Sequence, residues 1–216
     1  MKNKYELLIF DWDGTLYDSI PWIVNCLQQA AADCNLPLPS EPASRAVIGL
    51  SLELAMKDLF PEEPQAIIED LVRAYTRHYH GKPATSEGLF EGVPEMLESL
   101  KQAGLRLAVA TGKQHDYVPK VLASTGTTHW FDAVRGADDL LSKPDPRMLV
   151  ELMNEMHVLP ENTLMIGDST LDLRMAANAN VAAVGVSCGA NTAEELLAFN
   201  PLCCLRHTRE LLPKLL

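Results

Sequence analysis

Acidic side chains follow two short apolar runs of the sequence, and their spacing is typical of oxygen ligands around a cation. Asp11 and Asp13 come directly after the run 5–10, two residues apart, so extended backbone would point both carboxyl groups the same way. Two carboxylates this close resist joint ionisation unless a cation or a shared proton intervenes. Asp168 follows a second run, 163–166, and adds a third carboxylate. This set predicts a hard divalent ion with oxygen ligands, and Mg²⁺ is the simplest choice.

Other polar residues could hold an anionic group beside such a cation. Thr111 and the amide of Gly112 follow the apolar run 105–110, where a turn from a strand into a helix would form a cradle for oxyanions. Lys143 is followed by a proline just before a predicted helix, which favours extended backbone at the lysine. Alone, each residue would be interpreted as a helix cap or a solvated loop residue. Together with the carboxylates they predict a site for an anionic substrate.

The elements that must position these residues alternate between strands and helices over most of the chain. Short runs rich in Val, Leu or Ile predict strands at 5–10, 105–110, 163–166 and 181–186. Helical patterns lie at 93–103, 117–125, 146–157 and 171–178. This alternation predicts an α/β fold with a doubly wound parallel sheet, covered by helices on both faces. Ligands bind outside the carboxyl ends of the strands in such sheets, where the acidic residues would lie.

The alternation stops between the first predicted strand and residue 89. Apolar side chains recur there at helical spacing, and several prolines divide the region into short helices. The pattern predicts two domains, an all-helical insertion at 18–84 and an α/β core made of 1–17 and 85–216.

The composition excludes several classes of protein. The 216 residues are 47% hydrophobic and 22% charged, which is typical of a globular protein and excludes general disorder. A formal net charge of −11 argues against binding to a nucleic-acid backbone, which needs a basic surface. No apolar run is long enough for a signal peptide or a membrane span, and the five cysteines lack CxxC spacing. We therefore expect a cytoplasmic protein with reduced thiols, monomeric by default and without a membrane partner.

Taken in order, the polar residues resemble the motifs of the haloacid dehalogenase superfamily, in particular of its phosphatases with a helical cap inserted after the first motif. Within the superfamily, the chain looks most like phosphoglycolate-phosphatase-like proteins. Trp12 departs from the Phe or Leu that is usual at its position. The four motifs are Asp11-Trp12-Asp13-Gly14-Thr15-Leu16, Thr111-Gly112, Lys143-Pro144 and Gly167-Asp168-Ser169-Thr170-Leu171-Asp172.

The resemblance implies Mg²⁺-dependent hydrolysis of a small phosphorylated metabolite. Asp11 would attack phosphorus and form an aspartyl-phosphate, and Asp13 would protonate the leaving oxygen and later deprotonate the hydrolytic water. The metal ion would be held by Asp11, the main-chain carbonyl of Asp13 and Asp168.

The remaining motif residues would bind and orient the phosphoryl group. The resemblance implies that Thr111, the amide of Gly112 and Lys143 contact the phosphoryl oxygens. Asp172 would orient either metal-bound waters or Lys143 from behind the site.

The helical insertion is expected to act as a mobile cap, because phosphoryl transfer through an aspartate must first exclude bulk water. Its first turn begins just beyond Asp13, so Tyr17 and Trp22 are expected to overhang the leaving group. Arg45, in the glycine-containing break 45–51, is the third candidate for a contact with substrate. Packing within the cap is the alternative role for each of these three side chains.

Other functions are weighed against this interpretation. A dehalogenase of the same superfamily would not need Asp13, because no alkoxide leaving group is protonated. A phosphomutase would carry a histidine near position 23, where this chain has Ile23. A phospho-acceptor signalling domain also combines acidic residues with a threonine and a Lys-Pro pair, but the insertion 18–84 does not suit its compact fold. The GxSxG pattern at 185–189 matches a nucleophile elbow, yet too little sequence follows it for an α/β-hydrolase.

Overall fold

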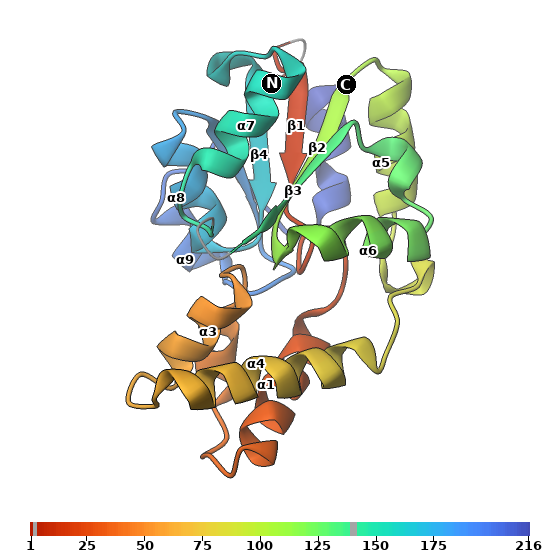
Figure 1. The fold of residues 1–216 in the computed structure, drawn as a ribbon. Coiled ribbons are helices and arrows are strands. Elements are labelled where there is room, and N and C mark those ends of the chain that lie inside the picture. Colours follow the sequence, from red (N-terminus) through yellow and green to blue (C-terminus); the bar gives the residue numbers. More distant parts are fainter. Residues whose placement is uncertain (2–3, 139–141) are drawn as a thin grey trace.

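The computed structural model describes residues 1, 4–138 and 142–216. In this part of the chain the strands form one six-stranded parallel sheet in the order β3-β2-β1-β4-β5-β6 (Figure 1). This arrangement confirms the predicted doubly wound α/β fold. The strands are β1 (Leu7–Phe10), β2 (Arg106–Gln114), β3 (Ala133–Ala137), β4 (Thr163–Gly167), β5 (Ala182–Val186) and β6 (Cys204–Leu205).

Helices cover both faces of the sheet, because successive residues of each strand point to opposite sides. Leu8 and Phe10 of β1 pack in an apolar core with α5 and α6, whereas Leu7 and Ile9 pack with α7 and α8. All four side chains are fully buried, as expected for a parallel strand with helices on both sides. The helices are α5 (Val93–Gln102), α6 (Val118–Ser124), α7 (Arg147–Met156), α8 (Thr170–Asn178), α9 (Ala193–Leu197) and α10 (Leu212–Leu215).

Short 3-10 helices connect several of these elements. The one at His115–Tyr117 joins β2 to α6, so the chain does not turn directly from strand into helix as predicted. The others lie at Ser86–Gly88, Thr128–Trp130, Pro160–Asn162 and Thr208–Leu211.

Strand β2 continues past its predicted end at residue 110. It runs to Gln114, and its pairing with β3 shifts register between Thr111 and Gln114. Thr111 and Gly112 therefore lie in the irregular last part of a strand. The turn into a helix that we expected at these two residues is wrong.

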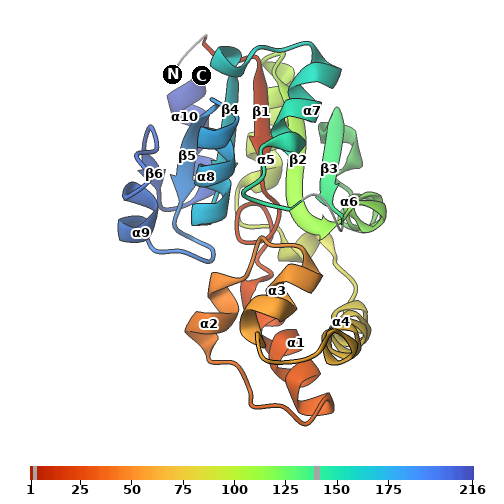
Figure 2. The ribbon, with the colours of Figure 1, turned by 60° about the vertical axis from the view of Figure 1, so that its left-hand side comes forward.

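Between β1 and α5 the chain forms four helices beyond the carboxyl ends of the strands (Figure 2). We call residues 20–80, which contain them, the helical segment. It has an apolar core of its own, in which Leu27, Met56 and Leu71 are buried. The helices predicted in this region are thus present, while the division of the chain into domains at 18 and 84 stays a prediction. The helices are α1 (Ile20–Asp33), α2 (Glu41–Ala46), α3 (Leu52–Leu59) and α4 (Gln65–His80).

The strand order changes direction at β1. The chain passes from β1 to β2 and β3 on one side, and then crosses to β4, β5 and β6 on the other. A crevice is expected at the carboxyl ends of β1 and its two neighbours, where the outgoing loops diverge. None of the helices in the described part of the chain combines the length and apolar character needed to cross a membrane. The five cysteines are free thiols.

Candidate active site

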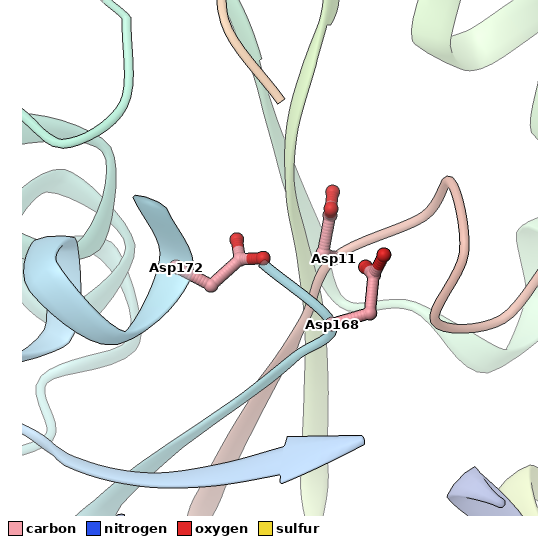
Figure 3. A group of neighbouring side chains, drawn as sticks. All are labelled: Asp11, Asp168 and Asp172. Atoms are coloured by element: carbon pink, nitrogen blue, oxygen red, sulfur yellow. The ribbon is translucent and has the colours of Figure 1, made fainter. Parts of the chain in front are cut away.

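Three buried carboxyl groups meet at the carboxyl ends of β1 and β4 (Figure 3). Asp11 directly follows β1, Asp168 directly follows β4, and Asp172 lies in the first turn of α8. Each offers one oxygen, and these three oxygens lie within 4.8 Å of one another. The three residues are 2%, 1% and 0% exposed, respectively. Parallel strands thus bring together carboxylates that are more than 150 residues apart in the sequence.

Lys143 lies buried between two of these carboxyl groups. Its Nζ is 2.8 Å from Oδ1 of Asp11 and 2.6 Å from Oδ1 of Asp172. Burial acts to lower the pKa of Lys143, but the carboxylates of Asp11 and Asp172 outweigh this effect and raise the pKa above its usual value. The lysine is therefore a fixed ammonium group directly beside the carboxylate of Asp11.

Asp168 is held by the two loops on either side of it. Thr15 Oγ1 donates a hydrogen bond to Asp168 Oδ1 at 2.8 Å, and the amide of Ala190 donates one to Oδ2 at 2.6 Å. Gly14 and Gly189 pack so closely on this carboxyl group that a Cβ at either position would overlap with it. The GxSxG pattern thus has a structural role here, since its last glycine lies against Asp168.

The electrostatics of this cluster fit a divalent cation. Burial raises the pKa of Asp168 to about 7, with a further contribution from Asp172. Burial also raises the pKa of Asp11 well above its usual value, although Lys143 partly offsets the effect. Three buried carboxylates face one ammonium group, so a second cation would offset the remaining negative charge. An all-oxygen donor set of this kind suits Mg²⁺.

Asp13 lies outside this group of three, contrary to the expectation that its carboxylate would complete the metal site. Within the described residues, the carboxylate that lies with those of Asp11 and Asp168 is that of Asp172. The Asp13 carboxylate is instead 2.8 Å from Nζ of Lys113 and accepts a hydrogen bond of 2.6 Å from Ser19 Oγ. The neighbouring ammonium group and hydroxyl group hold it on another side of the crevice. The predicted contribution of the Asp13 main-chain carbonyl to the metal site stays a prediction.

Lys113 connects Asp13 to the helical segment. Its Nζ donates a hydrogen bond of 2.6 Å to the hydroxyl oxygen of Tyr79, near the end of α4. Sequence reasoning missed both residues. Lys113 directly follows the Thr111-Gly112 motif, which is the available signal for it. Tyr79 follows the apolar spacing of a helix, which gives no signal for a site residue.

The motif at the end of β2 lies against the helical segment. Thr111 is fully buried, and its Oγ1 accepts a hydrogen bond of 3.3 Å from the amide of Lys113. A Cβ at Gly112 would lie 2.6 Å from the carbonyl oxygen of Gly49 and 2.7 Å from that of Leu50. Only a glycine permits this approach, so the segment rests directly on the end of β2.

Tyr17 does not overhang the crevice as predicted. Its ring stacks on that of Trp12, with 5.8 Å between the ring centroids. Its hydroxyl oxygen accepts a hydrogen bond of 3.1 Å from the amide of Thr85, and the ring leaves no room for a side chain at Gly88. Tyr17 therefore ties together the two stretches that join the helical segment to the sheet. Trp12, the departure from the family pattern, is a buried partner in this contact.

Trp22 and Arg45 each have partners within the protein. Trp22 lies under the ammonium group of Lys82, whose Nζ is 5.4 Å from the ring centroid. Arg45 pairs with Glu41 at 3.0 Å and donates a hydrogen bond of 3.2 Å to the carbonyl oxygen of Gly189. The structure thus uses Arg45 to hold the helical segment on the loop after β5.

A cavity of about 100 Å³ is lined by Asp11, Asp13 and residues of the helical segment. Its walls come from α1, α3, α4 and the stretch 47–50, and from the end of β2. Residues 47–50 of the break 45–51 line this cavity, whereas Arg45 does not, and contact of this break with substrate stays a prediction. Asp11 therefore borders both the carboxylate cluster and this cavity.

Comparison with known proteins agrees with this geometry. The family model of haloacid dehalogenase-like hydrolases matches residues 8–186, and the chain belongs to this family. It is 38% identical over 200 residues to "Probable phosphatase IndB" of Dickeya dadantii, covering 90% of this chain and 86% of that protein. It is 31% identical over 218 residues to a phosphoglycolate phosphatase of Colwellia psychrerythraea, covering 97% and 96% of the two chains.

A solved structure shows the same fold over nearly the whole chain. A hydrolase from Pseudomonas syringae superposes with a TM-score of 0.86 at 25% identity, covering 98% of this chain and 97% of that one. The prediction of a hydrolase similar to phosphoglycolate phosphatases is confirmed by these relatives. The signalling domain and the α/β-hydrolase considered above belong to other families.

Proposed function

We propose that this hydrolase removes the phosphoryl group of a small phosphorylated metabolite, and that Asp11 is its nucleophile. The observation that carries this proposal is the position of Asp11. Its carboxylate lies at the end of β1, 2.8 Å from the ammonium group of Lys143, within the carboxylate cluster and in the lining of the cavity. Relatives named as phosphatases cover most of the chain and support the same reaction.

The reaction proceeds in two displacements at phosphorus. An oxygen of Asp11 attacks the phosphorus atom, the bond to the leaving oxygen breaks, and Asp13 donates a proton to that oxygen. A water molecule then attacks the phosphorus of the aspartyl-phosphate while Asp13 accepts its proton, which releases phosphate and restores Asp11. Lys113 and Ser19 hold the Asp13 carboxylate in place for both proton transfers.

The other residues of the carboxylate cluster, together with Lys143, would bind the metal ion and the phosphoryl group. Asp11, Asp168 and the main-chain carbonyl of Asp13 would hold Mg²⁺, which supplies positive charge that offsets the repulsion between the carboxylate and the phosphoryl group. Asp172 positions Lys143 through their 2.6 Å contact. Lys143 donates hydrogen bonds to the phosphoryl oxygens.

Thr111 and the amide of Gly112 complete the binding of the phosphoryl group. Gly112 lines the cavity beside Asp11 and Asp13, which supports this role. Hydrogen-bond donors fixed in a buried site need little reorganisation during the reaction.

Residues 18–84 act as the cap domain in this proposal, over a core of 1–17 and 85–216. The segment touches the core at several separate points, including a hydrogen bond of 2.7 Å from the amide of Ser51 to Ser142 Oγ. Opening of these few contacts would admit substrate and water, and closure would exclude bulk solvent. The cytoplasmic location and the monomeric state stay predictions.

The residue at position 23 favours hydrolysis over phosphomutase chemistry. Ile23 lines the cavity, at the position where a mutase of this superfamily would be expected to carry a histidine. An isoleucine cannot exchange protons with the hydroxyl groups of a sugar phosphate, so transfer to water remains as the second step.

The proposal is tested by phosphate release from a phosphomonoester with an activated leaving group, such as p-nitrophenyl phosphate. We expect steady turnover with Mg²⁺, loss of turnover when EDTA is added, and recovery when Mg²⁺ is restored in excess. Turnover that EDTA leaves unchanged would contradict the metal assignment. Failure to release phosphate from any monoester would contradict the proposed function.

The contact between Gly112 and the helical segment gives a second prediction. Gly112→Ala adds a methyl group that must displace the carbonyl oxygens of Gly49 and Leu50, so the segment cannot close on β2. Since misplacement by about 1 Å can cost about 10²-fold in rate, we expect kcat/KM to fall by about that factor. Gly185→Ala is the matched control, because its Cβ would make only ordinary contacts, at 3.4 Å from Leu196. Equal activity of the two variants would show that this approach is unimportant.

A further inference from the structure

Much of the cavity wall is apolar. Aliphatic side chains of α1 and α3 and of the stretch between α2 and α3 line it. Ile23, Leu27, Ile48 and Ala55 are among them, and all four are buried. Thr76 and Gln114 add polar atoms to the walls, but most of the wall surface is apolar. The walls therefore favour an apolar or weakly polar group.

Aromatic rings of α4, together with that of Tyr117 in the 3-10 helix after β2, form another side of the cavity. Tyr75 and Tyr79 stack on each other with 5.5 Å between ring centroids and 15° between ring planes. The rings of His80 and Tyr117 lie 4.5 Å apart with a tilt of 30°. All four residues line the cavity. Clustered rings of this kind pack well against another flat ring.

Positive charge is scarce in the same walls. Among the described residues that line the cavity, one is a lysine, Lys113, and none is an arginine. The Nζ of Lys113 is already 2.8 Å from the Asp13 carboxylate and 2.6 Å from the Tyr79 hydroxyl. Arg45 is turned toward Glu41 and Gly189. A substrate with a second anionic group close to the phosphate would approach Asp11 and Asp13 without an unpaired cation to offset its charge.

From these observations we propose that the organic part of the substrate carries an uncharged ring, which lies between α1, α3 and the aromatic rings of α4. Phosphoglycolate, the substrate named for several relatives of this chain, is then a poor substrate of this enzyme. The inference rests on the proposed phosphatase function and specifies its substrate class.

The test compares three monoesters whose leaving groups are all alkoxides, namely benzyl phosphate, ethyl phosphate and phosphoglycolate. An uncharged ring that fills an apolar pocket should raise kcat/KM for benzyl phosphate by about ten-fold or more over each of the other two. Phosphoglycolate turned over as well as or better than benzyl phosphate would overturn the inference and leave the phosphatase function intact. Hydrolysis of none of the three, nor of p-nitrophenyl phosphate, would overturn both.

A variant locates the ring within the cavity. Ala55→Leu places three more carbon atoms in its wall, so kcat/KM for benzyl phosphate should fall by about five-fold more than kcat/KM for ethyl phosphate. Ala66→Leu makes the same change at an exposed position of α4 and should leave the ratio of the two kcat/KM values unchanged. If Ala55→Leu lowered kcat/KM for both substrates by the same factor, with an unchanged circular-dichroism spectrum, the ring would not occupy this space and the inference would be wrong.

Discussion

Asp11→Asn is expected to lower kcat by about 10⁴-fold or more, which is the scale of loss when a nucleophile is removed. The amide nitrogen and oxygen of asparagine are poor nucleophiles, and the change also removes a negative charge from the carboxylate cluster. The side chain keeps its shape, so the fold around β1 should be preserved. Release of phosphate from p-nitrophenyl phosphate, measured at saturating Mg²⁺, checks this expectation.

Asp58→Asn is the matched control, since Asp58 is exposed on α3 and lies outside the site. It should retain wild-type kcat. A value of kcat for Asp11→Asn close to that of the control would show that another group attacks phosphorus.

Asp13→Asn is expected to lower kcat by about 10²–10⁴-fold for esters whose leaving oxygen needs a proton. The asparagine cannot donate a proton to an alkoxide, and Lys113 loses its carboxylate partner. The loss should be much smaller for p-nitrophenyl phosphate, because nitrophenolate leaves without protonation. The measurement is the dependence of kcat on leaving-group pKa, compared between wild type and variant.

Lys113→Met separates proton transfer from positioning at this same contact. It removes the ammonium group that holds Asp13 but leaves the acid itself in place. Its loss of activity should therefore depend on the leaving group in the same direction as that of Asp13→Asn, but less steeply. If Asp13→Asn lowered kcat by the same factor for every leaving group, the role of Asp13 as general acid would be refuted.

The edge of the sheet that carries the site could be predicted from the sequence, because parallel strands end on one side. Asp11 and Asp168 each follow an apolar run, and that pattern is sufficient to bring them together. Strands β3 and β6 could not be predicted in the same way. Strand β3 contains Arg135 and Gly136 within five residues, and β6 has only two residues, so neither shows an apolar run.

The contacts between the helical segment and the site could not be predicted from the sequence. Tyr79 follows the apolar periodicity of α4, and only the position of that helix over β2 brings its hydroxyl group to Lys113. Tyr17 and Arg45 have residue types suited to substrate contact, yet they hold the segment on the core through Thr85 and Gly189. Such roles depend on tertiary contacts between distant residues, which local patterns do not encode.

The central claim, that Asp11 carries the phosphoryl group between the two displacements, can be tested by trapping the intermediate. Turnover is stopped with acid within milliseconds, and the protein is reduced with borohydride, which converts a phosphorylated aspartate into homoserine. Peptide mass spectrometry then locates the change. We predict homoserine at position 11, only in samples that contain both substrate and Mg²⁺. Homoserine at position 13, or no modified aspartate while phosphate is being released, would contradict the claim.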